Sequence, residues 1–183
     1  GQHIPILSEM FPEIKMILYD TAPFKIKETN KIKNLQQLFT DEEMKKYLDV
    51  PNLLFVSDIR SAPKAGYVQD PDKEDPEFEE EVRKNLIQQR NWVEGIKPVR
   101  SLLKFRLPFT SEEEKATTNY LDGIIFFQAY PPPHSAETRL EVGPKAKSIV
   151  YDHTKYEQQM FYFNTQYRIQ TFAHYQKKYG WSY

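Results

Sequence analysis

A lysine stands in the middle of an apolar segment at residues 101–109, where Lys104 has a leucine before it and a phenylalanine after it. Lysine is rarely buried unless it is paired, so this position calls for an oppositely charged partner. Two carboxylates occur in comparable settings, since Asp58 ends an apolar run and Glu137 lies in another strand-like segment. An amine held between carboxylates can take up and release a proton. Three ionisable groups on three separate predicted strands therefore indicate one site.

Each of these three residues also has an ordinary structural explanation. Asp58 could cap the end of its strand, and Glu137 could be a solvated charge paired with Arg139. Lys104 could extend its charged end into solvent from an edge strand. The residues alone leave these alternatives open.

Strand and helix patterns alternate through the first two thirds of the chain. The predicted strands and helices there are 4–11 (helix), 14–19 and about 35–39 (strands), 41–48 (helix), 53–56 (strand), 78–96 (helix) and 101–107 (strand). The last third predicts strands at 121–130 and 136–142, a hairpin partner at 148–151, and a helix from about 154 to 173. This order predicts an α/β fold with a mostly parallel sheet and an antiparallel edge. Ligands of such sheets bind outside the carboxyl ends of the strands, where Asp20 and Asp58 stand.

Composition indicates one globular domain of 183 residues, with 39% hydrophobic and 28% charged residues. The formal charge of −1 excludes an overall basic footprint for nucleic acid, so an RNA contact needs a local patch. Two basic clusters could supply one: Lys25, Lys27, Lys31 and Lys33, or Lys97, Arg100, Lys104 and Arg106. A solvated surface is the alternative for the first cluster.

Several other classes of protein are disfavoured. The chain has no cysteine, which removes disulfides and thiolate sites. We find no metal-ligand spacing, no signal peptide, and no apolar run of the roughly 18 residues that a membrane span needs. We therefore expect a soluble, intracellular protein without a membrane partner or a metal.

The beginning of the chain has the approximate spacing of a nucleotide-binding fingerprint. Gly1 is followed by a predicted helix, a predicted strand and then Asp20. In such a fingerprint, an acid about 20 residues beyond a glycine-rich turn accepts hydrogen bonds from ribose hydroxyls. The spacing does not separate S-adenosylmethionine from NAD, and an acid at a strand end can also be a simple turn cap.

Four segments, in this order and spacing, resemble the poxvirus-type cap-specific mRNA (nucleoside-2'-O-)-methyltransferase family: residues 56–61, 103–109, 135–140 and 156–164. The resemblance runs from Gly1 to about Tyr167. It implies a Rossmann-like, S-adenosylmethionine-dependent methyltransferase domain over residues 1–183, with its N-terminal part missing. The implied reaction is methyl transfer to the ribose 2'-hydroxyl of the first transcribed nucleotide of capped mRNA.

The resemblance also implies catalytic roles. Asp58, Lys104 and Glu137 match the last three members of a lysine, aspartate, lysine, glutamate tetrad, whose first lysine would lie upstream of Gly1. We assign Lys104 to the reacting hydroxyl, whose proton must be accepted as the methyl group is transferred. The reaction requires no metal.

The family's S-adenosylmethionine site is represented by part of its loop and by residues further along. By resemblance, the residues assigned to the cofactor are Gly1, His3, Asp20, Phe39, Thr40 and Asp58. Gly1 and His3 belong to the end of the glycine-rich loop, and Asp20 matches the acid on the cofactor ribose. Phe39 and Thr40 begin the segment near the adenine.

The family grips a cationic 7-methylguanine between aromatic rings and recognises its edge with carboxylates. Phe109 matches one stacking ring, and Glu157 matches an acid that accepts hydrogen bonds from the base. Ser111 replaces a second acid of the family pattern, and His134 replaces a tyrosine. Glu157 has an alternative, because Thr154 three residues earlier would make it part of a helix capping box.

Two other functions stay open. One is a 2'-O-methyltransferase that acts on uncapped RNA, which would not need Phe109 or Glu157. The other is a non-catalytic, RNA-binding processivity subunit of poly(A) polymerase, a second role known in the family. The expected partners are capped mRNA and a poly(A) polymerase catalytic subunit, in the cytoplasm of a host cell or in a virion.

Overall fold

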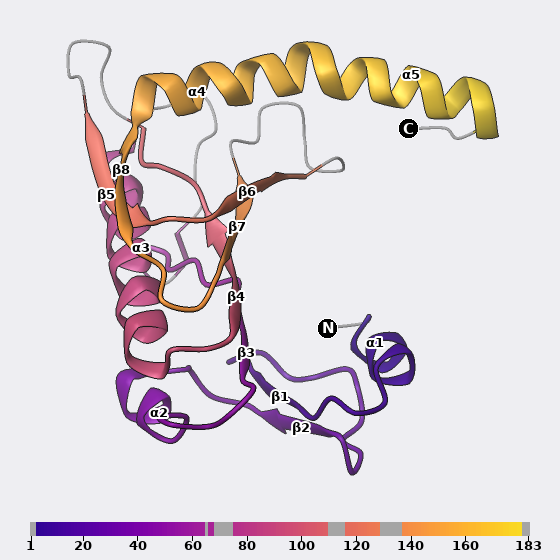
Figure 1. The fold of residues 1–183 in the computed structure, drawn as a ribbon, viewed down its shortest axis with the longest axis vertical. Helices are drawn as coiled ribbons and strands as arrows, with labels where there is room; N and C mark the ends of the chain where they lie inside the picture. Colours follow the sequence, from indigo (N-terminus) through magenta and orange to yellow (C-terminus); the bar gives the residue numbers. More distant parts are fainter. Residues whose placement is uncertain (1–2, 65, 68–74, 110–115, 129–136, 181–183) are drawn as a thin grey trace. The chain divides into compact units, whose positions relative to one another are not determined.

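The computed structural model describes residues 3–64, 66–67, 75–109, 116–128 and 137–180. The chain divides into two compact units, Gly1–Leu48 and Asp49–Tyr183 (Figure 1). Both units combine helices with strands, which confirms the α/β class. The assignment of residues 1–183 to one domain stays a prediction.

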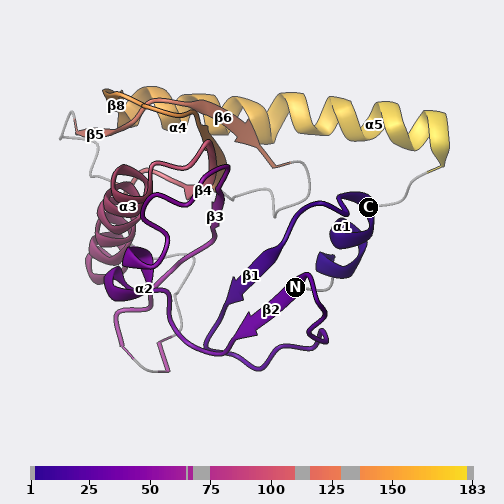
Figure 2. The same ribbon diagram turned by 60° about the horizontal axis from the view of Figure 1, so that its bottom comes forward.

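The first unit consists of four elements: α1 (Ile4–Met10), β1 (Met16–Tyr19), β2 (Ile32–Leu35) and α2 (Asp41–Lys45). The strands β1 and β2 are parallel neighbours, with Met16 opposite Ile32 (Figure 2). The strand predicted at about 35–39 is wrong in position, because the Gln37 amide donates to the Leu35 carbonyl and this tight turn ends β2. The helix α2 starts as its sequence predicts, since the Thr40 side chain accepts a hydrogen bond from the Glu43 amide.

The second unit contains a four-stranded sheet with the order β3 (Leu54–Ser57), β4 (Arg100–Phe105), β7 (Thr138–Val142) and β6 (Ile124–Phe127). Only β3 and β4 are parallel, and β7 is antiparallel to both of its neighbours. The prediction of a mostly parallel sheet is therefore wrong, and the sheet is mixed. A parallel pair needs a long crossover, and the connection from β3 to β4 contains the helix α3 (Pro76–Ile96).

The strand predicted at 121–130 is two strands that belong to different sheets. β5 (Thr117–Leu121) pairs with β8 (Ser148–Asp152), and β6 pairs with β7. The chain changes sheets at Gly123, where a Cβ atom would lie 2.3 Å from the Glu141 carbonyl oxygen. The hairpin predicted between 136–142 and 148–151 is also wrong, because β4 and β6 already occupy both edges of β7.

Gly123→Ala is expected to destabilise the protein by about 1 to 3 kcal/mol, because its methyl group would collide with backbone that cannot move freely. Thermal unfolding of the full-length protein measures the effect. Gly143→Ala is the matched control, since the nearest atom to its added Cβ is the flexible end of Arg100 at 3.6 Å. Equal melting temperatures for the two variants would contradict the close approach at Gly123.

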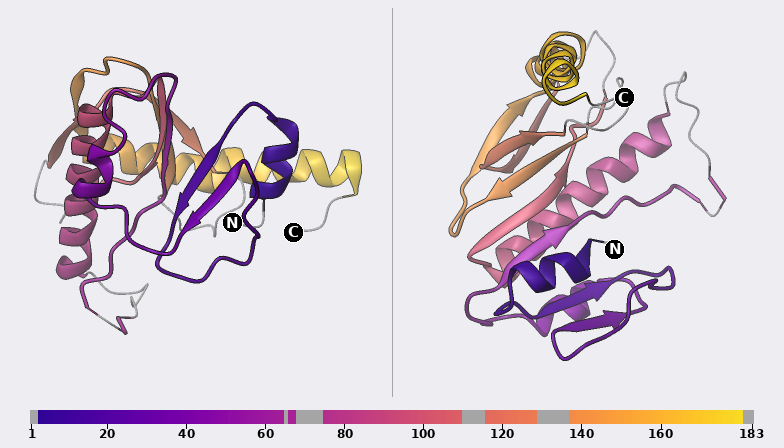
Figure 3. Two further views of the ribbon diagram at one scale, coloured as in Figure 1. Left: turned by 90° about the horizontal axis from the view of Figure 1, so that it is seen from below. Right: turned by 90° about the vertical axis from the view of Figure 1, so that its right-hand side faces the viewer.

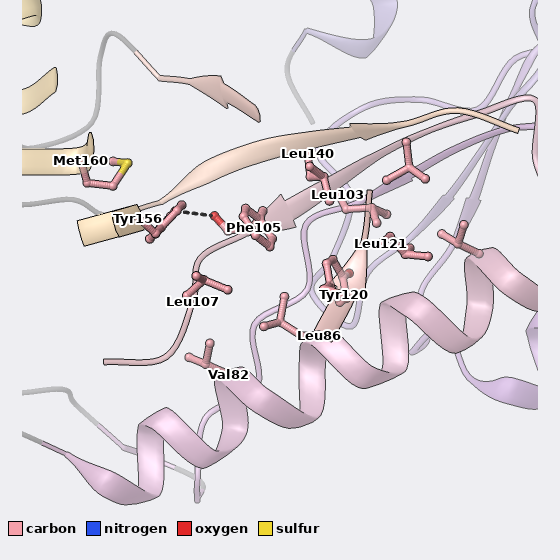
Figure 4. Packing of buried hydrophobic residues seen from close by; sticks show 12 residues of the cluster. Val82, Leu86, Leu103, Phe105, Leu107, Tyr120, Leu121, Leu140, Tyr156 and Met160 are labelled. Carbon is pink, nitrogen blue, oxygen red and sulfur yellow. Dashed lines mark hydrogen bonds between the residues drawn. The ribbon is translucent and has the colours of Figure 1, made fainter. Parts of the chain in front are cut away.

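The core of the second unit lies between α3, the inner sheet face and β5. The α3 residues Val82, Leu86 and Val93 recur at helical spacing and are buried, as the sequence predicts. Figure 4 shows Val82 and Leu86 below the buried strand residues Phe105 and Tyr120, whose rings stack at a centroid distance of 5.6 Å. The inner sheet face is thus sealed, and its strands are held in fixed register.

The chain closes with three consecutive helical elements: α4 (His153–Tyr162), the π-helical turn η1 (Phe163–Tyr167) and α5 (Arg168–Tyr179). They form one continuous rod, orange to yellow in Figure 3. This helix begins within one residue of its predicted start and runs six residues beyond its predicted end at 173. Within the described ranges, none of the helices combines the length and the apolar character that crossing a membrane requires.

Candidate functional site

Lys104 lies on β4, a strand paired on both sides by β3 and β7. Successive side chains of a strand alternate between its faces, so Leu103 and Phe105 enter the core while Lys104 points to the opposite face. The edge-strand explanation for Lys104 is therefore wrong. Its side chain is only 15% exposed, which makes the ionic partners around it essential.

The structure brings the three sequence-predicted residues together. Lys104 Nζ lies 3.3 Å from Asp58 Oδ1 and 3.0 Å from Glu137 Oε2. Asp58 directly follows β3 and Glu137 directly precedes β7, the two strands that flank β4. The pairing of the sheet thus places both carboxylates beside one amine.

A fourth residue, Arg139, completes what we call the Lys104 cluster. Arg139 lies opposite Lys104 in the register of β4 and β7. Its two terminal nitrogens lie 2.8 Å from Asp58 Oδ1 and 2.7 Å from Glu137 Oε1. The predicted pairing of Glu137 with Arg139 is therefore present, but together with Lys104 rather than in its place. The sequence predicted Arg139 only as a partner of Glu137, and not as a second cation beside Lys104.

The Lys104 cluster balances two cations against two carboxylates. Burial acts to raise the pKa of Glu137, but hydrogen bonds from Arg139 and Lys104 outweigh it and lower the pKa below the ordinary value. Glu137 therefore remains an ionised acceptor. Asp58 is the open member of the cluster, with 66% of its side chain exposed, so the cluster is accessible from solvent on this side.

Arg139→Gln is expected to raise the pKa of Glu137, because the largest of the interactions that lower it is lost. NMR titration of the Glu137 carboxyl measures the shift. The stability that the ionised Glu137 provides exists above its unfolded-state pKa and is lost as the pH falls through the lower folded-state value. An unchanged Glu137 titration in the variant would rule out the Arg139 interaction. The matched control is Arg100→Gln, which removes the arginine paired with the neighbouring Glu141 and should leave the Glu137 titration unchanged.

A second group of residues surrounds Phe109. The buried Glu79 of α3 accepts hydrogen bonds at 2.9 Å from Arg106 and from the Phe109 amide. The Arg106 guanidinium lies over the Phe109 ring, 4.6 Å from its centroid. Glu79 and Arg106 therefore hold Phe109, while 47% of Phe109 remains exposed for a ligand. No pattern in the sequence pairs Glu79 with residues about 30 positions away, and sequence reasoning missed it.

Glu157 lies on α4 near the same carboxylate. Burial, with a smaller contribution from the charge of Glu79, raises the pKa of Glu157. The capping-box explanation is wrong, because the helix starts earlier and Asp152 is the N-cap that accepts from the Lys155 amide. Glu79 thus binds the Phe109 amide and also acts electrostatically on Glu157. Ser111 and His134 lie outside the described residues.

The residues assigned to the cofactor are mostly in the first unit. Asp20 is exposed at the end of β1, and its Oδ1 accepts a hydrogen bond from the Ala22 amide, as in the turn-cap alternative. The Phe39 ring packs edge-to-face on Tyr19 at a centroid distance of 5.0 Å. An exposed carboxylate and a partly buried ring in one unit have the chemistry that ribose hydroxyls and an adenine require.

For the other residues of the first unit that are assigned to the cofactor, the structure offers less support. Thr40 uses its side chain to cap α2. His3 occupies the N-cap position of α1 and makes no side-chain capping bond there. Gly1 lies outside the described residues. Across the part of the chain that the structure describes, no three His, Cys, Asp or Glu side chains are grouped to hold a metal ion.

Comparison with known proteins gives the family. The family model described as poly A polymerase regulatory subunit matches residues 1–182. The chain belongs to this family. No curated protein matches the chain in sequence.

Among solved structures, the chain is similar to bluetongue virus VP4, described as a multifunctional RNA-capping production line, with a TM-score of 0.59 and 11% sequence identity. The match covers 86% of this chain and 26% of VP4, so the chain spans about a quarter of that protein's length. At this identity the likeness concerns the fold alone. It supports a mixed α/β fold of the kind found in a viral capping protein, and the Rossmann-like topology stays a prediction.

Proposed function

We propose that this chain is an RNA-binding regulatory subunit of a poly(A) polymerase, and that its Lys104 cluster also methylates capped mRNA. The first role is the one that the family description favours. The second is the chemistry that the geometry supports best. The observation that carries it is the position of Lys104 Nζ within 3.3 Å of Asp58 and 3.0 Å of Glu137 on an accessible sheet face.

The proposed reaction transfers a methyl group to the 2'-hydroxyl of the first transcribed nucleotide. S-adenosylmethionine, when bound, supplies the methyl group. A ribose hydroxyl is a poor nucleophile, so its orientation and the removal of its proton set the rate. In its neutral form the Lys104 amine accepts that proton, and Asp58 and Glu137 hold the resulting ammonium. Arg139 fixes both carboxylates in place.

The residues proposed to bind S-adenosylmethionine and the cap are those assigned above. Asp20 and Phe39 would hold the ribose and the adenine of S-adenosylmethionine. Phe109 would stack on the cationic 7-methylguanine, and Glu157 would accept hydrogen bonds from the edge of the base. Glu79 supports this site by fixing the Phe109 backbone.

Methyl transfer from labelled S-adenosylmethionine to capped and uncapped RNA of one sequence separates this activity from its nearest rival. The full-length protein is expected to methylate the capped RNA preferentially. Equal transfer to both RNAs would favour a general RNA 2'-O-methyltransferase, for which Phe109 and Glu157 have no use.

The regulatory role is tested by tail synthesis with a purified poly(A) polymerase catalytic subunit. Addition of the full-length protein is expected to lengthen the tails. Lys104→Ala is expected to lengthen them equally, because proton transfer at the cluster takes no part in polymerisation. Tails of unchanged length, together with no binding to the catalytic subunit, would exclude this role.

A further inference from the structure

A row of aromatic rings follows one side of the C-terminal helical segment. Phe163 stacks on Tyr167 with ring centroids 5.7 Å apart, and Tyr175 stacks on Tyr179 at 5.8 Å. At the start of the row, Phe127 of β6 stacks on Phe163 at 4.8 Å. Residues four apart are neighbours on a helix surface, which accounts for both stacked pairs, and Thr171 stands midway between Tyr167 of η1 and Tyr175 of α5. We call these five aromatic residues the aromatic row.

The row is accessible along its length. Tyr167 is 57% exposed and Tyr179 is 53% exposed, and the one buried residue of α5 is Arg168. Contiguous exposed apolar residues are a feature of interaction sites. Phe163 and Tyr167 of the row lie in η1, and π-helical turns occur frequently at functional sites.

The charge around the row identifies the kind of partner. The whole chain has 26 acidic residues among 183, about one in seven, yet residues 158–183 contain none. The same stretch carries the exposed Lys177 and Lys178, while its Arg168 is buried, and Lys178 Nζ lies 5.0 Å from the centroid of the Tyr179 ring. Aromatic faces combined with positive charge are what proteins use to bind single-stranded nucleic acid. An apolar protein partner would account for the rings but not for the missing acids.

The row starts beside the strand that carries the proposed reaction site, but on the other face of the sheet. Phe127 lies opposite Thr138 in the register of β6 and β7, and Thr138 is buried in the core, whereas Arg139 of the Lys104 cluster lies opposite Phe126. We propose that the aromatic row binds single-stranded RNA. This inference rests on the proposed RNA-binding role and names the surface that performs it.

The test measures binding of a fluorescently labelled, uncapped oligouridylate to the full-length protein by fluorescence anisotropy. The triple variant Tyr167→Ala, Tyr175→Ala, Tyr179→Ala is expected to bind at least tenfold more weakly, because each lost ring removes a stacking surface. The corresponding triple Phe variant is expected to stay within about threefold of the wild type, because it keeps all three rings. Alanine is a strong helix former, so circular dichroism should show the helix retained.

Two controls separate stacking from other effects. The double variant Phe161→Ala, Ile169→Ala removes apolar residues outside the row that are more exposed than its tyrosines, and is expected to bind RNA like the wild type. The triple Leu variant of the row keeps apolar area without ring faces and should bind as weakly as the triple Ala variant. Lys177→Ala with Lys178→Ala should flatten the salt dependence of binding, by up to about 0.7 per lost phosphate contact.

The outcomes distinguish the inference from the function on which it rests. If the wild-type protein does not bind the oligouridylate, the RNA-binding role itself fails. If the wild type binds and the triple Ala variant binds equally well, the role stands and the aromatic row is not its surface. A row that is required for binding the polymerase catalytic subunit, but not for binding RNA, would overturn the inference in favour of a protein partner.

Discussion

Lys104→Ala is expected to lower the rate of methyl transfer to capped RNA by about 100-fold or more, because it removes the group proposed to accept the hydroxyl proton. Single-turnover kinetics with saturating S-adenosylmethionine measure this rate. Binding of S-adenosylmethionine should stay within a few-fold of the wild-type value, because Lys104 is assigned to the hydroxyl and not to the cofactor.

Two further variants show what Lys104 contributes. Lys104→Arg keeps a cation between Asp58 and Glu137, but a guanidinium does not lose its proton in a protein and so cannot act as a base. This variant should be nearly as inactive as Lys104→Ala. Lys147→Ala removes an exposed lysine of the same unit and should leave the rate unchanged. Wild-type turnover in Lys104→Ala, or a loss of cofactor binding as large as the loss of activity, would remove Lys104 from the reaction.

Phe109→Ala is expected to weaken binding of a 7-methylguanosine cap analogue by about ten- to a hundredfold. Stacking of a base on an aromatic ring contributes about 1 to 3 kcal/mol, and each 1.4 kcal/mol is about tenfold in affinity. Titration of the full-length protein with methylated and unmethylated cap analogues measures the change. Glu157→Gln should also weaken binding, because the amide oxygen still accepts but the charge-assisted bond is lost.

Phe11→Ala is the matched control for the cap site. Phe11 is 48% exposed, against 47% for Phe109, so it tests the loss of an equally accessible ring elsewhere. Phe109→Ala and Glu157→Gln should both leave S-adenosylmethionine binding unchanged. If the wild type does not prefer the methylated analogue, or if neither substitution reduces that preference, the cap-binding assignment is wrong.

The sequence predicted the parts of the site that depend on alternation along a strand. Lys104 interrupts an apolar strand, and the core on one side of β4 forces its charge to the other side. The two carboxylates had to neutralise that charge, and they do. Glu79 could not be found in this way, because its contacts with Arg106 and Phe109 depend on how α3 packs against the end of β4.

The sequence failed where strand pairing depends on distant contacts. The apolar run through Leu121 and Phe127 looks like one strand, and only the contact between Gly123 and the Glu141 carbonyl shows why the chain divides there. The partner of β8 likewise depended on which edges of β7 were already occupied. Local sequence patterns do not show where the chain moves from one sheet to another, or which strand pairs with β8.

The most direct test of the Lys104 cluster compares two capped RNAs that differ only in the sugar of the first transcribed nucleotide. One carries ribose and the other 2'-deoxyribose, and labelled methyl transfer from S-adenosylmethionine by the full-length protein is measured on both. The proposed reaction predicts transfer to the ribose form, none to the deoxyribose form, and loss of transfer in Lys104→Ala. Equal labelling of the two RNAs would contradict it, because the methyl group would then be going to an atom other than the 2'-oxygen.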